Sequence, residues 1–131
     1  MSGQAGQYRL LWSLRITEER CDGVLVLSPA GRLSHSSAGA LDAALTAAIE
    51  REKGGLVIDL GKVDYASSAG LLMIAAAARL AHARGVLVLC ALTEPVRIAL
   101  DLAGLLPHVA IEPSRERAIA RIASPTGSGR R

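Results

Sequence analysis

Residues 56–92, LVIDLGKVDYASSAGLLMIAAAARLAHARGVLVLCAL, indicate the fold class of this chain. This stretch opens with a short apolar run rich in β-branched residues, passes through a polar connection at 61–66, and continues as a long apolar segment that stops at Gly85. A second short apolar run follows. Short buried strands on either side of a helix are typical of a parallel sheet. We therefore predict strands at 56–60 and 86–92, with a helix at about 68–84.

The flanking residues extend this alternation of strands and helices. GVLVLS at 23–28 is another apolar run, bounded by Asp22-Gly23 and by Pro29, and residues 8–16 are predicted as an earlier strand. Leu41, Leu45 and Ile49 recur every four residues, which predicts an amphipathic helix capped by Ser36 or Ser37. Further helices are predicted from Thr93-Glu94-Pro95 and from Pro113-Ser114, with a short strand at 108–112 between them. The order predicts an α/β fold with a mainly parallel sheet of four to five strands.

Length and composition set the limits on domains, compartment and ligands. With 131 residues we expect one domain, residues 1–123, followed by a disordered tail, SPTGSGRR, at 124–131. The net charge of +3 includes two terminal arginines and the aromatic content is 2%, which argues against nucleic-acid binding. The N-terminus does not resemble a signal peptide, and the longest apolar run is about half the length of a membrane span. We expect a cytoplasmic protein without membrane insertion.

Sequence signatures of enzymes and metal sites are scarce. The chain contains no phosphate-binding loop, no GxGxxG and no GxSxG. Cys21 and Cys90 lack metal-ligand spacing, as do the three histidines, so we expect no metal, no cofactor and no enzymatic activity. One alternative stays open, a hydrolase built from Ser68, His35 and Asp59 or Asp64, because residues at the ends of parallel strands can converge.

The corner SSAG, residues 67–70, lies where the polar connection meets the long helix. Unpaired N–H groups and a partial positive charge mark the first turn of a helix, so a phosphate group is stabilised there. One serine suffices as a helix cap, and Ser67 alone could be the whole explanation of the corner. If Ser67 caps the helix, the hydroxyl of Ser68 points elsewhere.

Residues 57–92, together with GRLSHSSAGALDAAL at 31–45 and VRIALDLAGL at 96–105, resemble the STAS domain family, whose small members are bacterial anti-sigma factor antagonists. The resemblance covers about residues 10–122. It implies a mostly parallel sheet with helices packed on one side. It also implies a phosphate-accepting serine in an Asp-Ser-Ser/Thr-Gly motif, which falls on Ser68 when the sequences are aligned on Gly70. Two positions depart from the family pattern, because Ser67 and Ser34 stand where relatives often have Asp.

The resemblance implies a phosphorylation-controlled antagonist. When unphosphorylated, such a protein binds an anti-sigma factor that is also a serine kinase, which releases the sigma factor, and a phosphatase opposes the kinase. A monomer or weak homodimer is expected. The alternative is a constitutive STAS scaffold or regulatory subunit of an ABC transporter or of a stress-sensing complex. The expected partner-binding surface surrounds Ser68 and consists of Ser34, His35, Ser67, Ala69, Gly70 and Leu72.

Overall fold

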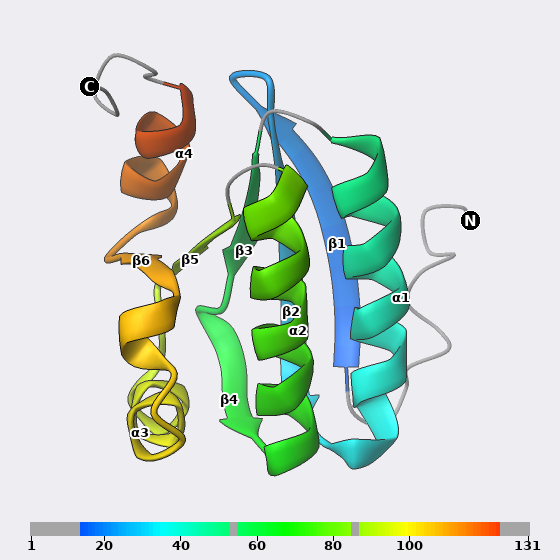
Figure 1. Ribbon diagram of the computed structural model, residues 1–131, viewed down its shortest axis with the longest axis vertical. Coiled ribbons are helices and arrows are strands. Elements are labelled where there is room, and N and C mark those ends of the chain that lie inside the picture. Colours follow the sequence, from blue (N-terminus) through cyan, green and yellow to red (C-terminus); the bar gives the residue numbers. More distant parts are fainter. Residues whose placement is uncertain (1–13, 53–54, 85–86, 124–131) are drawn as a thin grey trace.

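The computed structural model describes residues 14–52, 55–84 and 87–123, so the predicted tail at 124–131 and the first predicted strand before Leu14 lie outside the described residues. These ranges form one six-stranded sheet with helices packed against it (Figure 1). None of the described helices has the length and apolarity that crossing a membrane requires. In chain order the elements are β1 (Leu14–Cys21), β2 (Val24–Leu33), α1 (His35–Arg51), β3 (Leu56–Asp59), β4 (Lys62–Ala66), α2 (Ser68–Arg84), β5 (Leu87–Cys90), α3 (Glu94–Leu102), the 3-10 helix η3 (Leu106–His108), β6 (Ala110–Glu112) and α4 (Arg115–Ala123).

The sheet has the strand order β1-β2-β3-β5-β6, with β4 paired to β2 beside this path. β1 and β2 are antiparallel and are joined by Asp22 and Gly23, whose φ angles of 53° and 81° are those of a type I′ hairpin turn. All the other strand pairs are parallel. The predicted α/β class and mainly parallel sheet are confirmed. The described ranges form six strands rather than the predicted four to five.

The additional strand, β4, lies in the segment 61–66 that the sequence predicts to be a connection. It forms because β2 does not end near Pro29 but continues to Leu33. The first part of β2 pairs with β3 through Leu25–Leu27, and its last part pairs with β4 through Ala30–Leu33. Pro29 falls between these two ladders, where its missing N–H removes no bond to either strand.

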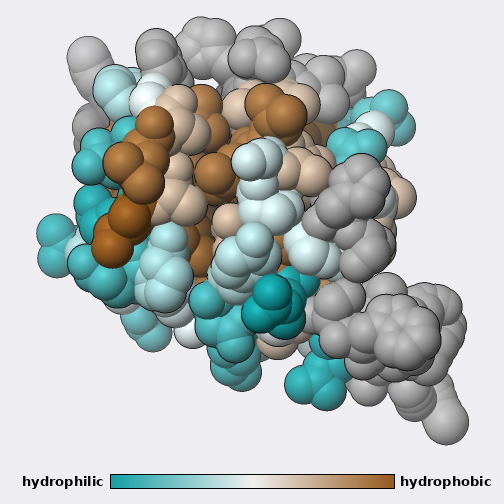
Figure 2. Space-filling view, turned by 90° about the horizontal axis from the view of Figure 1, so that it is seen from below, coloured by the Kyte–Doolittle hydropathy of each residue, from teal (hydrophilic) through white to brown (hydrophobic). Residues whose placement is uncertain are grey.

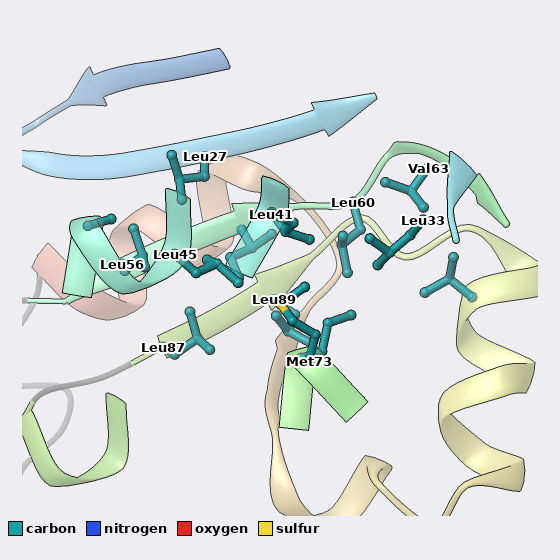
Figure 3. Packing of buried hydrophobic residues seen from close by; sticks show 14 of the residues in the cluster. Leu27, Leu33, Leu41, Leu45, Leu56, Leu60, Val63, Met73, Leu87 and Leu89 are labelled. Atoms are coloured by element: carbon teal, nitrogen blue, oxygen red, sulfur yellow. The ribbon is translucent and has the colours of Figure 1, made fainter. Parts of the chain in front are cut away.

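The two faces of the sheet have separate apolar clusters, because alternate side chains of a strand point in opposite directions. The larger cluster joins Leu27, Ile58 and Leu89 of the central strands to α1, α2 and α3 (Figure 3). The intervening strand residues, among them Val26 and Val57, pack instead with Ala118 and Ile119 of α4. The chain has no Phe, and its aliphatic core is divided between the two faces of one sheet.

Candidate functional site

Two helices begin side by side at one end of the sheet. β2 and β4 are parallel neighbours, and each runs directly into a helix, β2 through Ser34 into α1 and β4 through Ser67 into α2 (Figure 1). The N–H of Ser67 donates to the carbonyl of Leu33 at 2.8 Å. This bond joins Ser67, the residue before α2, to Leu33, the residue before Ser34. The structure therefore brings Ser34 and the 67–70 corner together.

Ser67 is the N-cap of α2. Its Oγ accepts the N–H of Gly70 at 3.2 Å, and its carbonyl accepts the N–H of Leu71 at 2.9 Å. The first of these bonds satisfies one of the N–H groups that the first turn of a helix leaves unpaired. Capping by Ser67 is thus confirmed, and it leaves Ser68 as the first residue of α2. Ser68 is exposed to solvent.

Gly70 sets how closely α2 approaches the end of β2. It is buried, while Ala69 beside it is half-buried. A Cβ atom at Gly70 would lie 2.6 Å from Cγ of Leu33 and 3.0 Å from the carbonyl oxygen of Leu33. Carbon atoms in contact are normally about 3.5–4.0 Å apart, so a side chain at this position requires the helix or Leu33 to move. The glycine of the corner therefore permits the close approach of α2 to the end of β2.

The cap of α1 is Ser34, so the prediction of Ser36 or Ser37 is wrong. Ser37 is the third residue of the helix and completes a capping box with Ser34. The Oγ of Ser37 accepts the N–H of Ser34 at 2.9 Å and donates to the carbonyl of Arg32 at 2.8 Å, which accounts for a serine that is only 2% exposed. The Ser-x-x-Ser spacing of residues 34 and 37 is the signal that could have located this cap. The side chain of His35, the first residue of α1, lies outside the described residues.

The end of the molecule at which α1 and α2 begin lacks nearby carboxylates on its helices. Neither α1 nor α2 has an acidic residue in its first turn. Arg32, on β2, is exposed and lies over the ring of Tyr65 on β4, with 4.4 Å between the guanidinium carbon and the ring centroid. The positive ends of the two helix dipoles favour an anion at the start of each helix.

Apolar side chains are exposed beside this polar corner. Leu72, one helical turn after Ser68, is 70% exposed, and Tyr65 is 40% exposed. On α3, Ile98 and Leu102 are exposed as well. Viewed toward the end at which α1 and α2 begin, Figure 2 shows apolar surface in the upper left and centre, bordered by hydrophilic surface at the left edge and below. Exposed apolar side chains bordered by polar groups are the composition of a protein-binding surface.

Asp59, one of the acids considered for a hydrolase, has its carboxylate bound to groups other than Ser68. Its carboxylate accepts the N–H of Gly61 at 2.9 Å and pairs with Nε of Arg115 at 2.9 Å. The other considered acid, Asp64, is exposed on β4. Within the described ranges no group of three or more potential ligands could hold a metal ion. The residues that a triad requires are therefore not assembled around Ser68 by any contact in the described part of the chain.

Arg115 is a residue that no sequence pattern singles out. It begins α4 and pairs with Glu19 of β1 at 2.6 Å and with Asp59, and it donates to Oγ of Ser28 at 2.8 Å. The hydrogen bonds to Glu19 and Asp59 raise the pKa of Arg115, so the guanidinium remains charged. Its partners are 56 to 96 residues away in sequence, so no local pattern indicates the cluster. Its role is to attach α4 to the sheet.

Comparison with known proteins agrees with this arrangement. The model of the family described as "STAS domain" matches residues 15–118. BtrV of Bordetella bronchiseptica, assigned by its name to the anti-sigma factor antagonists, is 35% identical over 108 residues, which are 82% of this chain and 93% of BtrV. The crystal structure of an anti-sigma factor antagonist from Mycobacterium paratuberculosis superimposes with a TM-score of 0.76 at 30% identity, covering 84% of this chain and 94% of that one.

A more distant structure has the same fold. Phosphorylated SpoIIAA, the Bacillus cell fate determinant, superimposes with a TM-score of 0.61 at 20% identity and covers 82% of this chain and 98% of its own. The likeness of fold thus extends to a protein with little sequence identity to this one. Because the family model spans most of the chain and a relative with 35% identity is covered almost completely, this protein belongs to the STAS domain family.

Proposed function

We propose that this protein is an anti-sigma factor antagonist whose unphosphorylated form binds an anti-sigma factor kinase, and that phosphorylation of Ser68 weakens this binding. The observation that carries the proposal is the exposed hydroxyl of Ser68 at the start of α2, beside a separate cap residue and one turn before the exposed Leu72. The protein acts by binding rather than by catalysis, in the cytoplasm, as a monomer or weak homodimer. The proposed partner-binding residues are Ser34, His35, Ser67, Ala69, Gly70 and Leu72.

Relatives support the general function. BtrV and the mycobacterial protein are both described as anti-sigma factor antagonists, and each matches nearly its whole length to this chain. SpoIIAA, which shares only the fold, has been solved in its unphosphorylated and its phosphorylated form. A protein with this arrangement of strands and helices therefore remains folded when it carries a phosphate.

The proposed switch acts through charge at the contact surface. A partner kinase transfers the γ-phosphoryl group of ATP to the Oγ of Ser68, which loses its proton, and ADP leaves. The phosphoserine adds a charge of about −1.5 to −2 at pH 7. Because Ser68 is exposed at a helix start, α2 remains folded, and the effect appears as repulsion and desolvation at the interface. Each tenfold loss of affinity corresponds to about 1.4 kcal/mol, so a few unfavourable contacts suffice for a usable switch.

The test uses immobilised wild-type protein and the variants Ser68→Ala and Ser68→Asp as paired baits in lysate of the source organism. Captured proteins are identified by mass spectrometry, and the affinity of each candidate is then measured with purified proteins. We expect wild type and Ser68→Ala to bind a histidine-kinase-like ATPase and Ser68→Asp to bind it at least tenfold more weakly. Ser114→Asp is the matched control, since Ser114 caps α4 by accepting the N–H of Arg117 and Asp is an equally good cap. Equal affinity of wild type and Ser68→Asp would contradict the proposed switch.

One observation favours a second candidate function. The positions where relatives often carry Asp, 34 and 67, are occupied here by serines that both cap helices. A constitutive scaffold or regulatory subunit of an ABC transporter or a stress-sensing complex needs no phosphorylation chemistry at this corner. For that function, one partner is captured equally by wild type and by Ser68→Asp, and its affinity depends on Leu72.

A further inference from the structure

Arg32 is placed to interact with a group on Ser68. Arg32 and Tyr65 are direct partners in the β2–β4 ladder, and the next pair is Leu33 with Ala66. Neighbouring strands are about 4.8 Å apart. From Tyr65 the chain reaches Ser68 in three residues, which span at most about 10 Å and less where the helix has begun. Leu33 and Ala66 pack on the face of the sheet that α2 covers, so Arg32 and Tyr65 leave the opposite face. The arginine side chain therefore reaches a phosphate on Ser68 around the ends of the two strands.

The guanidinium of Arg32 packs on an aromatic ring instead of pairing with a carboxylate. It lies 4.4 Å from the ring centroid of Tyr65, and both residues are exposed. Within the described parts of the chain Arg32 forms no ion pair, in contrast to Arg20, Arg51 and Arg115, which each pair with at least one carboxylate. A cation–π contact at an exposed site is weak, so it orients the side chain without preventing its release.

Among the charged residues of β2 and β4, Arg32 is the cation whose position in the strand ladder is closest to the start of α2. Lys62 is exposed at the opposite end of β4, where it pairs with Ala30, and Asp64 is exposed next to Tyr65. Asp64 forms no ion pair among the described residues. Arginine is the side chain that binds phosphate oxygens in a bidentate manner.

We propose that Arg32 binds the phosphate of phosphorylated Ser68 and exchanges the face of the Tyr65 ring for the phosphate oxygens. This inference rests on Ser68 being the phosphorylated residue of the proposed function. Arg32, the residue before Leu33, thereby recognises the phosphorylated state of its own molecule. In the phosphorylated protein Arg32 then neutralises part of the new charge and orders the phosphate over the corner.

The test requires no partner protein. Phosphoserine is incorporated at position 68 by genetic encoding, and the second ionisation of the phosphate, with a pKa of about 6, is followed by ³¹P NMR as a function of pH. The Arg32→Gln variant should show a phosphate pKa higher by about half a unit, the shift expected when an exposed ion pair is lost. Arg32→Lys, which keeps the charge, should retain most of the low value. The control is Arg97→Gln, which removes an exposed arginine from α3 and should leave the phosphate pKa unchanged.

Equal phosphate pKa values in the wild-type and Arg32→Gln proteins would refute the inference, as would an equal rise in Arg97→Gln. A partner that ignores Ser68→Asp would instead refute the proposed function, because the ³¹P titration of the isolated protein does not depend on any partner. The two failures are therefore distinguishable.

Discussion

Replacing Gly70 by alanine tests whether the close approach of α2 to β2 maintains the corner. In an unconstrained helix, alanine is more favourable than glycine by up to about 1 kcal/mol. At Gly70 the new Cβ would lie 2.6 Å from Cγ of Leu33, about 1 Å inside the normal carbon–carbon separation. Leu33 is fully buried, and its carbonyl oxygen, 3.0 Å from the same position, belongs to the backbone. Neither neighbour can move away without disturbing its own contacts.

Overpacking of this kind costs about 1–3 kcal/mol, which exceeds the gain in helix propensity. We expect Gly70→Ala to lower the free energy of unfolding by about 1–2 kcal/mol. With a urea m-value of about 1.5 kcal/mol/M, the unfolding midpoint falls by about 1 M. Because α2 must shift away from Leu33, Ser68 moves relative to Ser34, and affinity for the partner should fall as well.

The matched control is Gly39→Ala in α1. Gly39 is exposed and helical, and a Cβ atom added to it would have no neighbouring atom within 4 Å, so only the gain in propensity remains. We expect this variant to gain about 0.5–1 kcal/mol. Urea unfolding followed by circular dichroism gives both values under the same conditions. If Gly70→Ala were as stable as wild type, or gained as much as Gly39→Ala, the conclusion that Gly70 enforces the approach would be wrong.

Three further predictions concern stability and reactivity. Arg115→Ala should lower the free energy of unfolding by about 2 kcal/mol, because charged hydrogen bonds that attach α4 to the sheet are lost. Arg115→Lys should lose less, and urea unfolding midpoints measure both changes. An Arg115→Ala protein as stable as wild type would contradict the role assigned to Arg115. The hydrogen bond from Arg20 lowers the pKa of Glu52, so this pair stabilises the fold above pH 4.5 and ceases to do so as the pH falls through the lowered pKa. In Glu52→Gln the free energy of unfolding should therefore change less with pH over this acidic range, which unfolding midpoints at several acidic pH values measure. Burial raises the pKa of the Cys90 thiol to about 12, so a thiol reagent at mildly alkaline pH should modify Cys21 in the native protein and Cys90 only after unfolding; rapid modification of both would contradict the buried position.

The elements that the sequence predicts well are those whose signals lie within one short segment. The strands near 56–60 and 86–92 are apolar on both faces, the helix from Ser68 follows its cap, and Thr93-Glu94-Pro95 begins α3 as predicted. The cap at Ser67 is likewise a matter of one residue and the helix that follows it. Such signals need no knowledge of distant neighbours, because propensity, capping and hydrophobic periodicity act over a few residues.

The elements that the sequence mispredicts depend on pairing between distant residues. In β4 only Val63 is buried, so its composition is that of a loop, and it becomes a strand because the extended part of β2 supplies its hydrogen-bonding partners. The predicted end of β2 is too early because Pro29 is typical of a strand boundary, although in the sheet it falls between two ladders. The cap of α1 is Ser34 because the strand continues to Leu33.

Sequence patterns alone indicate the α/β class, the order of most elements, and a serine corner that resembles the phosphate-accepting motif of the STAS family. Only the tertiary structure placed Ser34 beside that corner, laid Arg32 over Tyr65, and joined α4 to the sheet through Arg115. The physical reason is the sequence distance over which each kind of interaction acts. Local backbone preferences depend on neighbouring residues, whereas a surface built from two strand ends and two helix starts exists only after the sheet has paired segments more than thirty residues apart.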